Sequence, residues 1–170
     1  MSMAERKPDA VDAIREQWRQ ERPDLDGEAM AILSRLARLL AVGTQQVESV
    51  FTAHGLQTGE FDVLATLRRS GEPYELTPSG LADTLMMSRA GMTGRLDRLE
   101  QAGLVRRIAD PGDRRSVKVA LTDRGLQLID VVVTEHFENE TRMLSVLSEA
   151  DRKHLDRIGR LLLTSFETRA

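Results

Sequence analysis

Apolar residues recur at intervals of three to four along most of the chain, which is the period of an amphipathic α-helix. The first such segment carries Val11, Ile14 and Trp18 on one face. It should end before Pro23, because the residue that precedes a proline disfavours helical backbone. The boundary residues of the next two helices are Asp26 and Gly55 for a long second helix, and Thr58 and Gly71 for a third. The pattern therefore predicts a mainly α-helical protein.

Two short helices follow, and the connection between them is only three or four residues long. The first opens at Thr77-Pro78, a capping hydroxyl followed by a first-turn proline. Ser88 caps the second helix, and Gly103 is a suitable residue for its end. This arrangement predicts a helix-turn-helix motif, whose second helix fits the major groove of DNA.

The apolar period changes from 3.6 to 2 after this motif, which indicates β-strands. Residues 105–108 and 117–121 form the two strand segments, and the sequence Asp-Pro-Gly-Asp at 110–113 between them is typical of a turn. The predicted β-hairpin carries Arg114 and Arg115 at its tip. A helix-turn-helix followed by such a hairpin, or wing, predicts a winged helix.

Two long helices capped by Thr122 and Ser148 complete the chain, and their apolar faces are larger than a winged-helix unit can cover. We expect these faces to meet a second copy of the chain, since a symmetric homodimer matches a pseudo-palindromic DNA site. The predicted fold class is mainly α with a small β-hairpin wing. The predicted organisation is an N-terminal extension helix at 1–25, a helical dimerisation region at 26–57 and 122–170, and a winged helix-turn-helix DNA-binding domain at 58–121.

The composition excludes several classes of function. With 41% apolar and 30% charged residues, the 170-residue chain is typical of a globular protein. It has no cysteine, which excludes disulfides, thiolate metal sites and cysteine nucleophiles. The histidines His54, His136 and His154 lie far apart in sequence, and no catalytic motif is present. We therefore expect no metal, no cofactor and no enzymatic activity.

Neither a membrane segment nor a targeting segment is expected. The longest apolar runs, such as residues 161–163, span three or four residues, whereas about 18 are needed to cross a bilayer. The first ten residues carry charges and a proline without an apolar centre, so they do not form a secretory signal. The expected location is the cytoplasm, without a membrane partner.

The distribution of charge favours double-stranded DNA as a partner, although the net charge is −3. Residues 88–118 hold eight basic and four acidic side chains, and a local basic segment is sufficient for a phosphate-binding face. A solvated helix start and a solvated turn with a surface ion pair are the alternative explanations. The residues expected to contact DNA are Ser88, Arg89, Thr93, Arg95 and Arg98 on the second helix and Arg114 and Arg115 on the wing, with Asp113 bracing Arg115.

Three stretches together resemble the MarR family of bacterial transcriptional regulators. They are residues 81–89, 99–107 and 113–122, and the string Asp-Arg-Arg-Ser at 113–116, followed by Leu-Thr at 121–122, is the most specific of their features. The resemblance covers the chain from about residue 28. It implies a homodimeric, mostly repressive DNA-binding protein that a small, often anionic aromatic ligand releases from DNA.

The N-terminal stretch 17–26 is similar to the PecS-like, urate-responsive branch of this family. The resemblance implies a ligand site formed by Trp18, Asp62, Arg95 and Arg107, the positions that match the branch's urate-response residues. Urate is a flat monoanion, so it could stack on Trp18 and pair with Arg95 while repelling Asp62. Such coupling between a ligand and DNA is typically worth about 1–3 kcal/mol.

Alternatives to this ligand site remain open. Trp18 is equally suited to anchor a dimer core, Asp62 to interact with a helix dipole, and Arg95 and Arg107 to contact phosphates. The effector is then another phenolic or carboxylate ligand. A dimeric small-molecule-binding module without DNA binding is the remaining alternative, against which the basic segment argues.

Overall fold

The computed structural model describes residues 7–110 and 113–168, and the side chains of residues 110–116 lie outside the described part. The chain divides into two compact units, of which the first ends at Gln46 and the second begins at Val47. Each unit is described by itself. None of the helices in the described residues is long and apolar enough to span a membrane.

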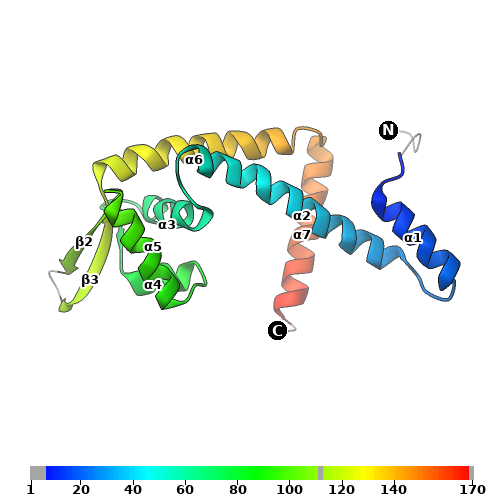
Figure 1. Ribbon diagram of the computed structural model, residues 1–170, viewed down its shortest axis with the longest axis horizontal. Helices are drawn as coiled ribbons and strands as arrows, with labels where there is room; N and C mark the ends of the chain where they lie inside the picture. Colours follow the sequence, from blue (N-terminus) through cyan, green and yellow to red (C-terminus); the bar gives the residue numbers. More distant parts are fainter. Residues whose placement is uncertain (1–6, 111–112, 169–170) are drawn as a thin grey trace. The chain divides into compact units, whose positions relative to one another are not determined.

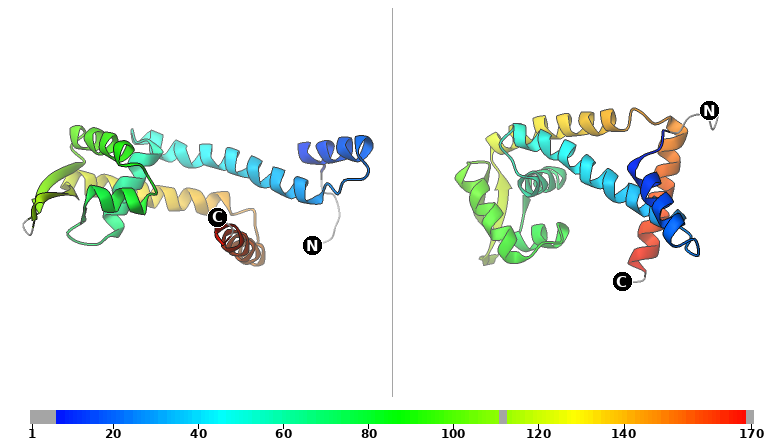
Figure 2. Two further views of the ribbon diagram at one scale, coloured as in Figure 1. Left: turned by 90° about the horizontal axis from the view of Figure 1, so that it is seen from below. Right: turned by 45° about the vertical axis from the view of Figure 1, so that its right-hand side comes forward.

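The first unit contains α1 (Ala10–Glu21) and most of α2 (Glu28–Ala53), both labelled in Figure 1. Asp9 caps α1, since its side chain accepts hydrogen bonds from the N–H groups of Val11 and Asp12. The Arg35 guanidinium binds Asp9 at 2.8 Å and also pairs with Asp12, which ties α1 to α2. Figure 2 shows α1 beside the first turns of α2.

The predicted helix boundaries in this region agree closely with the structure. The carboxylate of Asp26 accepts a hydrogen bond from the Glu28 N–H, so α2 begins one residue later than a cap at Asp26 implies. At its other end, Gly55 has a φ of +73°, and the Leu56 N–H donates to the Phe51 carbonyl at 3.0 Å. The second helix thus ends where its glycine predicts.

The second unit forms a winged helix (Figure 1). Its elements from α3 to the wing are α3 (Thr58–Arg69), β1 (Glu75–Leu76), α4 (Pro78–Thr84), α5 (Arg89–Gln101), β2 (Val105–Asp110) and β3 (Asp113–Leu121). The three strands are antiparallel in the order β1-β3-β2. The sequence predicts β2 and β3 but not β1, because two residues are too few to show an alternating pattern.

One hydrophobic core joins the helices and the sheet of the second unit. Phe51 at the end of α2 stacks on Phe61 of α3, with ring centroids 4.0 Å apart. The following α6 (Asp123–Met143) contributes Ile129 and Val132, both fully buried. The other large side chains that are fully buried in this core come from α3, α4, α5 and β3: Val63, Leu64, Leu67, Leu81, Met92, Leu96, Leu99 and Val119.

The last helix, α7 (Glu149–Glu167), is amphipathic but has no buried residue. Leu161 and Leu163 are each 60% exposed, and Phe166 is 56% exposed. The predicted caps of the two C-terminal helices are confirmed, since Thr122 accepts from Gly125 N–H and Ser148 accepts from Asp151 N–H. An apolar helix face without any cover is unusual for a monomer.

Candidate nucleic-acid interface

The helix-turn-helix consists of α4 and α5, and both of its predicted caps are confirmed. Thr77 Oγ1 accepts from Gly80 N–H at 3.1 Å, and Ser88 Oγ accepts from Gly91 N–H at 3.2 Å. Met86 in the connection has a φ of +50°, and the Met87 N–H donates to the Ala82 carbonyl at 2.8 Å. The chain therefore turns sharply between the two helices and presents the start of α5.

The outer face of α5 is polar and accessible at its N-terminal end. Ser88, Arg89 and Thr93 are exposed, and Thr93 Oγ1 donates to the Arg89 carbonyl at 3.0 Å. The inner face carries Met92 and Leu96, which are each 1% exposed. The core thus fixes the helix, while its first turn offers a guanidinium, hydroxyls and free backbone N–H groups to a phosphate or a base edge.

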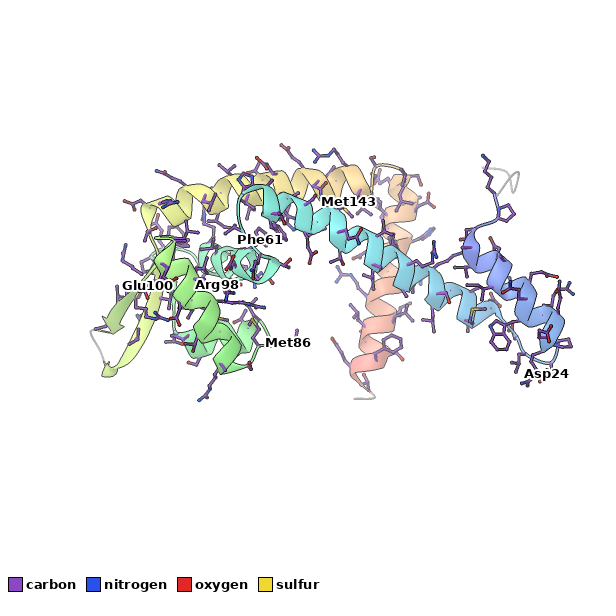
Figure 3. The ribbon with its side chains drawn as sticks, viewed as in Figure 1. Asp24, Phe61, Met86, Arg98, Glu100 and Met143 are labelled. Carbon is purple, nitrogen blue, oxygen red and sulfur yellow. The ribbon has the colours of Figure 1, made fainter. Side chains whose placement is uncertain are left out.

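Arg98, which is labelled in Figure 3, lies further along α5 and binds a carboxylate of α3. Its Nε donates to Glu60 Oε1 at 2.8 Å, and Glu60 is only 7% exposed. Oε2 of the same carboxylate accepts from the Gln57 N–H at 2.9 Å, which completes the capping box of α3. Arg98 remains about half exposed. The structure therefore shows Arg98 as a link between α5 and α3, a contact that the sequence analysis did not predict.

Replacing Glu60 with alanine is expected to lower the free energy of unfolding by about 1–2 kcal/mol, because the Gln57 N–H and Arg98 are both left without this acceptor. Urea denaturation would measure the change. Glu149→Ala is the control, since that carboxylate is 74% exposed and pairs with the equally exposed Lys153, so a change under about 0.5 kcal/mol is expected. Equal stability of both variants would show that the link between α3 and α5 contributes nothing.

Arg107 on β2 is held by two carboxylates of α5. Its Nη2 donates to Asp97 Oδ1 at 2.6 Å, and its Nη1 pairs with Glu100. The Arg107 backbone N–H also donates to Glu100 Oε1 at 3.1 Å. The hydrogen bond to Asp97 is the main reason why the pKa of Arg107 is raised. This side chain links β2 of the wing to α5, a second contact between elements that the sequence does not predict.

Arg95 and Asp62 lie within electrostatic reach of each other in the second unit. The Arg95 guanidinium contacts the sulfur of Met87 and lies directly against Gly59, where a side chain would collide with it. Burial raises the pKa of Asp62, and the positive charges of Arg95 and Arg69 oppose this rise. Among the described residues, no hydrogen-bond partner of Asp62 is found. An anion bound near Arg95 would therefore change the electrostatic potential at the Asp62 carboxylate, which has no hydrogen-bond partner among the described residues.

The remaining predicted residues lie elsewhere or outside the description. Trp18 belongs to the first unit, whereas Asp62, Arg95 and Arg107 belong to the second. Residues 113–115 form the start of β3, but the side chains of Asp113, Arg114 and Arg115 lie outside the described part. No group of three metal-ligating side chains occurs within residues 7–110 and 113–168 where side chains are described.

The fold and the exposed start of α5 define a winged helix-turn-helix protein. The model of the MarR family matches residues 54–116. The HTH-type transcriptional regulator PecS of Dickeya dadantii (strain 3937) is 49% identical over 145 residues, which are 85% of this chain and 87% of that protein. The chain belongs to the MarR family.

Solved structures agree with this assignment. AbsC, a MarR family transcriptional regulator from Streptomyces coelicolor, is 26% identical with a TM-score of 0.71, covering 85% of this chain and 97% of that one. Sco3205 from the same organism, a MarR family regulator solved in complex with DNA, shares the fold at 20% identity and a TM-score of 0.72, covering 83% and 89%. The predicted fold and the predicted class, a regulator and not an enzyme, are confirmed.

Proposed function

We propose that this protein is a ligand-responsive transcriptional regulator, most simply a repressor, which binds a pseudo-palindromic operator as a homodimer. The observation that carries the proposal is the exposed polar start of α5. There the helix-turn-helix, which is followed in the chain by the wing strands β2 and β3, presents Ser88, Arg89 and Thr93. Relatives that are named as transcriptional regulators, and a neighbour solved with DNA, support it. The DNA contacts are made by α5 in the major groove and by Arg114 and Arg115 on the wing.

The proposed effector is a small anionic aromatic molecule such as urate, which acts through Trp18, Asp62, Arg95 and Arg107. The proximity of Arg95 to a half-buried carboxylate without a fixed partner supports a response to anions. An anion that pairs with Arg95 weakens the favourable field at Asp62. Because Arg95 lies on α5, a change in this pair reaches the helix that contacts DNA.

A gel-shift titration tests both parts of the proposal. The DNA is the region upstream of the protein's own gene, and the added ligands are urate, salicylate and xanthine. Release by urate at a lower concentration than salicylate supports the regulator and the urate site. Binding that no purine disturbs leaves the regulator and contradicts urate, and a failure to bind DNA favours a small-molecule-binding module.

Replacing Arg115 with alanine is expected to weaken operator binding by about 1–3 kcal/mol per DNA contact of this side chain, because a guanidinium at the wing enters the negative potential of the minor groove. Fluorescence anisotropy at fixed salt would measure the decrease in affinity. Arg157→Ala on α7 is a control for the removal of one positive charge. Unchanged affinity of the Arg115 variant would remove the wing from the interface.

Trp18→Phe and Asp62→Asn are expected to reduce the response to the ligand while DNA binding without ligand persists. Asp62→Asn has a second expected effect. Because burial raises its pKa, the folded protein binds the Asp62 proton more tightly than the unfolded chain, and stability is lost as the pH rises through that pKa. The asparagine variant should therefore resist urea at pH 7 at least as well as wild type. A wild-type ligand response in both variants would contradict the assigned site.

A further inference from the structure

A small pocket lies in the N-terminal unit, where α1 turns into α2. Its volume is about 340 Å³, which is within the range of small-molecule sites. Helix α1 contributes Arg15, Trp18 and Arg19 to its lining. The loop after α1 contributes Leu25, among others, and the first turn of α2 contributes Met30. One aromatic ring, two apolar side chains and two guanidinium groups therefore meet in a space that fits one or two fused rings.

Arg15 is available to a ligand, whereas neighbouring arginines are engaged. Among the described residues, the Arg15 guanidinium has no hydrogen-bond or ion-pair partner. Arg19 pairs with Glu16 at 2.7 Å, and Arg22 pairs with Asp24 at 2.5 Å. The charge of Arg15 is thus not neutralised by a direct contact within the described part of its own unit.

The local backbone keeps Arg15 at this pocket. A Cβ atom on Gly27 would lie 3.2 Å from Arg15 Cγ, so the side chain of Arg15 passes closely over a residue that has none. The pocket also contains the Asp26 carboxylate, whose Oδ1 accepts from the Glu28 N–H. The pocket therefore also holds a carboxylate, whose Oδ1 is engaged with the start of α2, and the Arg15 guanidinium is its cationic group without a direct partner among the described residues.

The arginines expected to hold an anionic effector are less free than Arg15. Asp97 and Glu100 both bind Arg107, and Arg95 contacts the Met87 sulfur. Trp18, in contrast, is 50% exposed and shares its pocket with Arg15. An aromatic ring that stacks on Trp18 therefore shares the pocket with two guanidinium groups of the same helix, those of Arg15 and Arg19.

We propose that Trp18 and Arg15 form a binding site for a flat aromatic monoanion within the N-terminal unit, in which Arg15 pairs with the anionic group. The proposal rests on the proposed ligand response and assigns the pairing with the anion to Arg15 instead of Arg95. The ring stacks on Trp18, and Leu25 and Met30 contact its edge. The guanidinium can donate two parallel hydrogen bonds to a carboxylate or to a comparable pair of acceptors.

The test uses benzoate and its uncharged counterpart benzamide, together with urate. Trp18 is the only tryptophan of the chain, so its emission reports directly on benzoate binding, and calorimetry gives the affinity of all three probes. We expect benzoate and urate to bind the wild-type protein and benzamide to bind about tenfold more weakly, because it lacks the charge that Arg15 recognises. Failure of both anions to bind would overturn the proposal.

Arg15→Gln is expected to weaken the binding of both anions about tenfold while leaving benzamide unchanged. Arg22→Gln is the matched control, since it removes a guanidinium from the end of the same helix but outside the pocket, and its effect should stay below about twofold. Arg15→Lys retains the charge but not the paired donors, and it should bind with intermediate affinity. Wild-type affinity of Arg15→Gln for the anions would overturn the proposal.

The gel shift separates this proposal from the proposed function. If urate releases DNA from wild type but not from Arg15→Gln, both are supported. If urate releases both proteins equally, the regulator stands and the Arg15 site is wrong. If the anions bind in an Arg15-dependent manner but never release DNA, the site stands and the ligand response is wrong.

Discussion

Replacing Gly125 with alanine is expected to lower the free energy of unfolding by about 3 kcal/mol. A Cβ atom at this position of α6 would lie 1.9 Å from the Leu104 carbonyl oxygen and 2.9 Å from its carbon. That oxygen already accepts a hydrogen bond from the Thr122 N–H at 3.1 Å. The clash therefore involves backbone at the junction of β2 and α6, and it cannot be relieved by rotating a side chain.

Gly94→Ala is the matched control, because it makes the same change in a helix where the nearest atom to the added carbon is Arg98 Nη1 at 3.9 Å, an ordinary contact with the end of a flexible side chain. Removing a glycine from a helix interior should stabilise the protein by about 0.5–1 kcal/mol. Urea titrations of both variants measure the two effects, which are of opposite sign. A decrease below about 1 kcal/mol in Gly125→Ala would mean that α6 and β2 separate easily.

Introducing aspartate at Leu161 and Phe166 of α7 is expected to convert the proposed dimer into a monomer. Both side chains are more than half exposed in the single chain, and α7 buries no residue within it. If a second copy covers this face, each carboxylate would be buried against apolar atoms without a partner, which costs several kcal/mol. The expected result is complete dissociation at micromolar concentration.

Sedimentation velocity distinguishes the two states. Lys153→Asp is the control for added negative charge on α7, because Lys153 is 73% exposed and pairs with Glu149 one turn earlier. It should leave the dimer intact. A wild-type protein that sediments as a monomer, or a double variant that remains dimeric, would contradict the assignment of this face.

The sequence predicts most helix boundaries because the signals are local. Thr77, Ser88, Thr122 and Ser148 each accept a hydrogen bond from an N–H group three residues later, and the residue type alone indicates such a cap. Gly103, with a φ of +69°, similarly marks the end of α5. The change of apolar period is also a local signal, and it predicts the two wing strands without knowledge of their pairing.

Contacts between side chains of different elements could not be predicted in this way. The pairs formed by Arg98 with Glu60 and by Arg107 with Asp97 join residues on different elements, and the sequence shows only that each is charged. The capping box from Gln57 to Glu60 is found only in the structure, since the sequence pattern predicts Thr58 as the boundary of this helix, and a capping box does not show the second partner of the carboxylate. The sequence thus predicts Arg98 as a DNA contact and Arg107 as a ligand residue without showing which carboxylates hold them.

The junction at Thr122 has a geometric consequence for the reading of operators. Only this residue separates β3 from α6, and its Oγ1 donates to the Gly103 carbonyl at 2.8 Å while accepting from the Gly125 N–H at 3.0 Å. Thr122 consequently links the sheet, the end of α5 and the start of α6. In the proposed dimer, the direction in which α6 leaves this junction would contribute to the distance between the two copies of α5, and therefore to the spacing of the operator half-sites.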